Sequence, residues 1–119
     1  MKDEWTKVLD FYRKLDPKSP TESHTGVILI VEFILQSSLG ESLRHSISHG
    51  ALLISRKTPS ETREAKRTLR IWNLGCAQAV EICLEEQWQK DHTTFVRTDC
   101  VRCRNEDSVG YFQEYLRRL

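Results

Sequence analysis

The chain has 119 residues, of which 39% are hydrophobic and 29% are charged, and its formal net charge is +1. This length and composition are typical of one small globular domain, here residues 1–119, and exclude a disordered chain. The low net charge excludes a global electrostatic attraction to nucleic acid or to membranes. Any such role must therefore rest on local clusters of charge.

Apolar residues at helical spacing predict three helices in the first half of the chain. The first covers about residues 3–15. The second covers about residues 20–38, although its β-branched run also fits a buried strand. The third covers about residues 41–55, with Leu43, Ile47, Ala51 and Ile54 on one stripe. Residues 18–22 and 57–61 both have the Ser/Thr-Pro-x-Glu pattern of a helix start, because Ser or Thr caps free N–H groups and Pro needs no partner.

The strongest pattern predicts a long fourth helix over about residues 59–90. Its apolar and small residues follow one another at spacings of four and three, which is the seam of a heptad repeat. A fifth helix is expected over about residues 108–119, after a polar connector at 91–106 that includes a short extended piece at 93–98. The fold class predicted from these elements is all-α, a compact bundle of about five helices.

The heptad seam also predicts self-association. Its small side chains would let two copies of the helix approach closely, and the helix changes from basic to acidic along its length, which suits an antiparallel homodimer. The alternative is that the seam packs inside one chain. The residues expected in this interface are Leu69, Trp72, Cys76, Ala79 and Cys83.

A CxxC pair at residues 100–103 is a candidate for a structural zinc site. Zinc in such sites takes four Cys or His ligands in a tetrahedron. The expected ligands are Cys83, His92, Cys100 and Cys103. The alternative is that the cysteines are free thiols. His45 and His49 also have a chelating spacing but are interpreted as surface residues, because no further ligand accompanies them.

Basic residues on the outer face of the predicted fourth helix, with others just upstream, are a candidate surface for RNA or DNA. Clustered cations are enough for contact with phosphates. The residues are Arg63, Lys66, Arg67 and Arg70 on the helix and Arg44, Arg56 and Lys57 before it. The alternative is an ordinary solvated helix face.

No motif of a known catalytic site occurs in the chain, so we expect no enzymatic activity; a Cys-centred or metal-centred enzyme is the least favoured alternative. The function predicted first is that of a regulatory or adaptor-like protein that binds a protein partner or itself. Nucleic-acid binding, with zinc at the CxxC, is second. With four cysteines and no secretory signal pattern, we expect reduced thiols and an intracellular location, in the cytoplasm or the nucleus, with no membrane contact.

Overall fold

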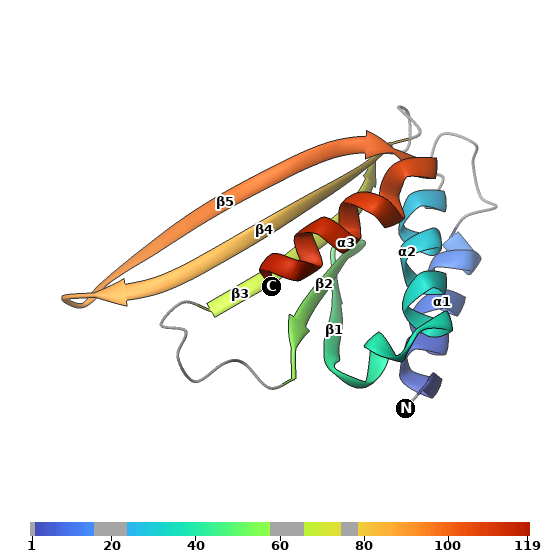
Figure 1. Ribbon diagram of the computed structural model, residues 1–119, viewed down its shortest axis with the longest axis horizontal. Helices are drawn as coiled ribbons and strands as arrows, with labels where there is room; N and C mark the ends of the chain where they lie inside the picture. Colours follow the sequence, from blue (N-terminus) through green and yellow to red (C-terminus); the bar gives the residue numbers. More distant parts are fainter. Residues whose placement is uncertain (1, 16–23, 58–65, 75–78) are drawn as a thin grey trace.

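Figure 1 shows the computed structural model of the chain, which describes residues 2–15, 24–57, 66–74 and 79–119. The described elements begin with helices α1 (Lys2–Leu15) and α2 (Thr25–Gln36) and the 3-10 turn η3 (Ser38–Glu41). The strands β1 (Leu43–Ser48), β2 (Ala51–Arg56), β3 (Lys66–Leu74), β4 (Ala79–Lys90) and β5 (Thr93–Arg104) follow. The 3-10 turn η5 (Asn105–Asp107) then leads into helix α3 (Ser108–Arg118).

The strands form one antiparallel sheet in the order β1-β2-β3-β4-β5, so neighbours in sequence are neighbours in the sheet (Figure 1). Two of the connections between these strands are tight turns. His49 and Gly50 join β1 to β2 with φ values of 53° and 82°, and Asp91 and His92 join β4 to β5 with φ values of 51° and 62°. Consecutive positive φ values give a turn whose twist matches that of the flanking strands. β1 and β5 are therefore the two edges of the sheet.

Side chains along each strand alternate between the two faces of the sheet. One face packs against the three helices and supplies a row of buried apolar residues: Leu52, Ile54, Leu69, Ile71, Val80, Ile82 and Leu84. The helices add Trp5, Tyr12, Ile30, Ile34 and Phe112 to the same core. The opposite face, here named the open face, has no described helix over it (Figure 1).

Polar contacts fix the start of α2 against the sheet. The Asn73 side chain in β3 accepts a hydrogen bond from the Val27 backbone N–H at 3.0 Å, and its amide nitrogen donates to Asn105 Oδ1 at 2.9 Å. A Cβ atom at Gly26 would lie 2.7 Å from that Asn105 oxygen. Only glycine therefore lets the helix approach this closely.

Three of the predicted helices are confirmed, because α1, α2 and α3 lie within or close to residues 3–15, 20–38 and 108–119. The all-α fold class is wrong. The expected third helix at 41–55 is the β1–β2 hairpin, and the expected long helix at 59–90 contains β3 and β4. The extended piece at 93–98 is the first half of β5. The two expected helix starts at 18–22 and 57–61 lie largely or wholly outside the described residues.

The physical reason for the error is that spacings of three and four mix the two faces of a strand. The strands instead carry buried residues at every second position, as at Leu69 and Ile71 or at Val80, Ile82 and Leu84. Apart from Cys83, the buried residues of the strands all lie on the helix-covered face, so period-two alternation is the pattern that decides.

Candidate functional site

The β4–β5 hairpin is the most prominent feature of the surface. The two strands pair along their whole length, from Ala79 opposite Arg104 to Lys90 opposite Thr93. Pairing between β3 and β4 ends at Gln87, so the last rows of the hairpin pair only with each other in the described part of the sheet. The hairpin extends along the longest dimension of the molecule, which measures 48 Å (Figure 1).

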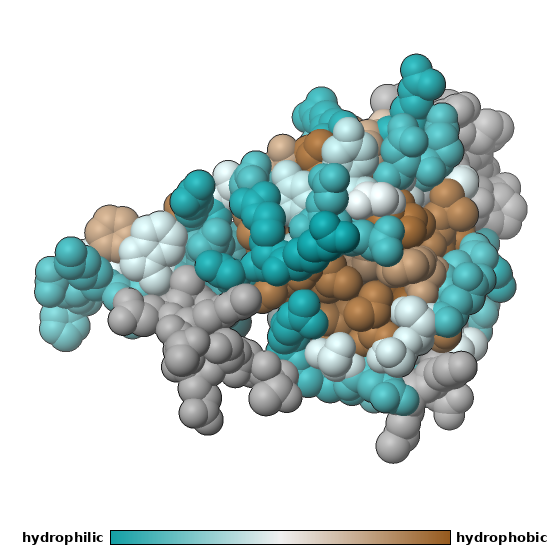
Figure 2. Space-filling view, in the orientation of Figure 1, coloured by the Kyte–Doolittle hydropathy of each residue, from teal (hydrophilic) through white to brown (hydrophobic). Residues whose placement is uncertain are grey.

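Two aromatic side chains occupy the far end of this hairpin. Trp88 and Phe95 face each other across the strands and stack, with ring centroids 5.8 Å apart and planes 17° from parallel. Phe95 is 42% exposed and Val96, on the opposite face, is 62% exposed. Figure 2 shows apolar colour at this end of the molecule, away from the main apolar area over β1, β2 and α2. Phe95 and Val96 therefore expose apolar surface on both faces at the far end of the hairpin.

In the part of the chain that the structure describes, β5 is an edge strand of twelve residues with no other strand paired to its outer side. The Cα atoms of Cys83 and Cys100 are 4.1 Å apart, a spacing typical of a non-hydrogen-bonded pair in an antiparallel ladder. In such a pair the backbone N–H and C=O groups point away from the neighbouring strand. The backbone groups of Cys100, and of Thr98 and Val96 at the same phase, are therefore directed outward from β4.

Opposite charges lie close together on this edge. Arg97 and Asp99 are on the helix-covered face of β5, opposite Glu86 and Leu84 of β4. The Asp99 carboxylate is 2.7 Å from the Arg118 guanidinium at the end of α3. This hydrogen bond raises the pKa of Arg118 further above its ordinary value. The end of α3 thus lies over Asp99, and the Trp88–Phe95 stack lies four residue pairs farther along the hairpin.

The basic residues predicted to bind nucleic acid do not form a single stripe. Two of them bind carbonyl oxygens at the C-terminal end of α3: Arg56 donates to Leu116 O at 3.1 Å and Arg67 to Arg118 O at 2.9 Å. These contacts place cations at the negative end of the helix dipole. Arg67 also lies 3.5 Å from Glu86.

Three of the remaining members of that set lie on the open face, on two different strands. Arg70 pairs with Glu85 on the open face at 3.4 Å. Arg44 and Lys66 are exposed on the same face, on β1 and β3, and Lys57 is exposed just after β2. Arg63 lies outside the described residues.

The residues predicted for a helical dimer seam also separate. Leu69 is fully buried beneath the helices and belongs to the core of this chain. Trp72, Ala79 and Cys83 are on the open face, and Cys76 lies outside the described residues. The structure therefore offers no shared helical seam among these residues.

Of the four predicted zinc ligands, the structure brings only Cys83 and Cys100 together. Cys83 and Cys100 form a disulfide across β4 and β5, which corrects the expectation of reduced thiols for this pair. Cys103 is on the other face of β5, because residues three apart in a strand point to opposite sides. Burial and the nearby charge of Asp107 raise the pKa of its thiol. His92 is at the hairpin turn, eight residues from Cys100 and hence about 25 Å away along the strand.

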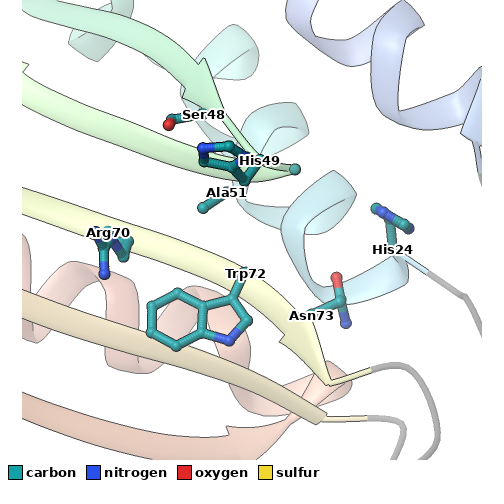
Figure 3. Close-up of a pocket in the computed structure, with 8 residues that line it drawn as sticks. His24, Ser48, His49, Ala51, Arg70, Trp72 and Asn73 are labelled. Atoms are coloured by element: carbon teal, nitrogen blue, oxygen red, sulfur yellow. The ribbon is translucent and has the colours of Figure 1, made fainter.

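An open hollow of about 420 Å³ lies beside the β1–β2 turn, where β3 presents Trp72. Figure 3 shows Arg70, Trp72 and Asn73 on one side of it and His49 on the other. The Arg70 guanidinium, already paired with Glu85, lies 5.9 Å from the Trp72 ring centroid. The Asn73 amide is held by Val27, Ala79 and Asn105. These contacts of Arg70 and Asn73 stabilise the fold.

Comparison with protein-family models, curated proteins and solved structures yields no match to this chain. Among the described residues, the helices are too short or too polar to cross a membrane. Sequence reasoning missed the hairpin because its residues were assigned to a helix and a connector. Part of the signal is in the sequence, as apolar residues at every second position at Val80, Ile82 and Leu84 before Asp91-His92 and at Val101 and Cys103 after it.

Proposed function

We propose that this chain is a protein-binding module that associates with a second copy of itself through the free edge of β5. The observation that carries the proposal is the length of this edge together with its exposed apolar residues. β5 has twelve residues, against a mean strand length of about 5–6 residues. A long edge strand presents unpaired N–H and C=O groups that readily pair with another strand.

The outward backbone groups fix which residues can pair. Two copies of β5 related by a two-fold axis would run antiparallel. Residues whose backbone N–H and C=O groups point outward must then lie opposite residues of the same kind in the second copy. An axis at Thr98 satisfies this condition, since Thr98 would pair with itself and Val96 with Cys100 of the second copy. The two sheets would then join into one continuous sheet with the helices of both copies on the same side.

Side-chain chemistry favours this register over its neighbours. With Thr98 on the axis, Arg97 lies opposite the second copy's Asp99, and Phe95 lies opposite the second copy's Val101. The backbone condition also allows an axis at Val96 or at Cys100, but either shift moves Asp99 away from the second copy's Arg97, so that it lies opposite Thr93 or Val101. Like charges directly opposite are destabilising, whereas opposite charges and apolar pairs each contribute about 0.2–1 kcal/mol.

Self-association is favoured over nucleic-acid binding by the engagement of the basic residues. Arg56, Arg67 and Arg70 contact groups of this chain, so fewer cations remain for phosphates. A regulatory or adaptor role would follow if the same edge also accepted an extended segment of another protein, since strand addition uses the same backbone groups.

Sedimentation equilibrium on three variants tests the proposal. Thr98→Pro removes one outward N–H without removing a bond to β4, so the dimer is lost while the thermal unfolding midpoint changes little. Arg97→Asp replaces two attractive contacts per dimer by two repulsive ones, and we expect the dissociation constant to rise at least tenfold.

Arg104→Asp is the matched control, because it makes the same charge change on β5 beyond the paired stretch. It should leave the dissociation constant within about twofold of the unaltered chain. A chain that stays monomeric at high micromolar concentration would overturn the proposal. So would equal effects of Arg97→Asp and Arg104→Asp.

A further inference from the structure

The disulfide on the open face is part of a wider group of ligand atoms. The sulfurs of Cys83 and Cys100 and a carboxylate oxygen of Glu81 all lie within 4.8 Å of one another. Glu81 precedes Cys83 by two residues, so both side chains are on the same face of β4. Cys83 is 3% exposed and the Glu81 side chain is 13% exposed, whereas Cys100 is open to solvent.

Contacts at both of its oxygens orient the Glu81 carboxylate. Oε2 accepts a hydrogen bond from Arg102 Nε at 2.6 Å. Oε1 lies 3.6 Å from Cys83 Sγ and so faces the sulfur pair. A carboxylate held by one oxygen, with the other directed at neighbouring ligand atoms, is the arrangement in which outer groups position a metal ligand.

We propose that reduction of the Cys83–Cys100 disulfide creates a Zn²⁺ site with Cys83 Sγ, Cys100 Sγ and Glu81 Oε1 as its ligands. A dithiol reductant supplies the two electrons and two protons that break the S–S bond, and leaves as its own disulfide. Zn²⁺ then displaces the proton of each thiol. Water takes the fourth position, because Zn²⁺ in proteins is usually four-coordinate.

The choice of metal follows from the donor atoms and the surrounding charge. Two thiolates are soft donors, which select Zn²⁺ over Mg²⁺ or Ca²⁺. Zn²⁺ with two thiolates and one carboxylate carries one net negative charge. Arg102 on Glu81, together with Arg70 opposite Cys83 on β3, provides positive charge beside it. This set differs from the one predicted from the sequence, because it contains Glu81 and excludes His92 and Cys103.

The test uses the full chain with Cys76→Ser and Cys103→Ser, so that only the paired cysteines remain. The protein is reduced with a phosphine and titrated with Co²⁺ and then Zn²⁺ under anaerobic conditions. We expect one Co²⁺ per chain with the intense visible bands of a tetrahedral thiolate site, displaced by one Zn²⁺. The oxidised protein should bind neither metal at this site.

Two matched variants identify the third ligand. Glu81→Gln should weaken Zn²⁺ binding at least tenfold. Glu85→Gln, on the same strand and face but paired with Arg70 on the far side of Cys83, should leave it unchanged. Equal effects of the two variants would overturn the proposal. Loss of the sheet signal in circular dichroism on reduction, or no Co²⁺ binding by the reduced protein, would overturn it as well.

Discussion

Trp88 and Phe95 stack across the β4–β5 hairpin, four residue pairs beyond Asp99, which binds Arg118 at the end of α3. This position separates the pair from the buried core, since Trp88 is only partly covered and Phe95 is 42% exposed. An aromatic pair of this kind stabilises the hairpin locally and also presents an apolar surface. The same two residues thus connect the conformation of the hairpin with the proposed contact between copies.

Phe95→Ala tests the contribution of Phe95 to the proposed contact between copies separately from the stability of the monomer. In the proposed dimer Phe95 covers Val101 of the second copy, so its loss should raise the dissociation constant about tenfold, equivalent to about 1.4 kcal/mol. The unfolding midpoint of the monomer should change little, because the residue lies outside the core. Analytical ultracentrifugation and thermal unfolding measure the two quantities. Phe11→Ala is the control, since Phe11 is exposed to 40% on α1. An equal effect of Phe11→Ala would contradict the account.

Asn73→Ala tests the contact that fixes α2 to the sheet. The substitution leaves the Val27 N–H and the Ala79 carbonyl without their side-chain partner. An unsatisfied polar group in a largely buried position costs about 1–3 kcal/mol. We expect the free energy of unfolding in urea to fall by about 2 kcal/mol or more. Ser46→Ala on the open face should change it by less than about 0.5 kcal/mol. A comparably small change for Asn73→Ala would show that these hydrogen bonds contribute little.

His45 gives the fold a measurable dependence on pH. Burial beside Trp5, whose ring centroid is 4.7 Å away, lowers the pKa of His45 despite the opposing effect of Glu4. The unfolded chain therefore binds a proton more readily than the folded chain. The stability that neutral His45 contributes is present above about pH 6.5. It decreases as the pH falls from the pKa of His45 in the unfolded chain to its lower pKa in the folded chain. In the His45→Gln variant, the free energy of unfolding measured in urea should no longer show this decrease with falling pH. An identical pH dependence of the free energy of unfolding in the unaltered chain and in His45→Gln would contradict the assignment.

How much of the fold the sequence predicts depends on the period of its apolar residues. The helices α1 and α3 each bury one side and carry the helical spacing clearly, at Trp5, Val8 and Tyr12 or at Phe112 and Leu116. The strands were missed because residues such as Leu69, Trp72 and Cys83 also fit a heptad. Those three residues belong to two strands and to two faces of the sheet.

The site was predictable only in part, because it depends on pairing between strands. The CxxC at 100–103 suggests two ligands side by side, but a strand directs them to opposite faces. The partner of Cys100 is Cys83, seventeen residues away, and its identity follows from the register of the β4–β5 hairpin. No spacing rule applied to a single segment supplies that register, which depends on the position of the turn at Asp91 and His92.

In the proposed dimer, β5 pairs with β5 of the second copy about Thr98. In an antiparallel ladder, residues of a non-hydrogen-bonded pair bring their Hα atoms into close contact. An isotope-filtered nuclear Overhauser experiment on an equal mixture of ¹³C-labelled and unlabelled chains detects such contacts between copies only. We expect a cross-peak between Hα of Arg97 in one copy and Hα of Asp99 in the other. Absence of this cross-peak in a sample that sediments as a dimer would contradict the proposed interface.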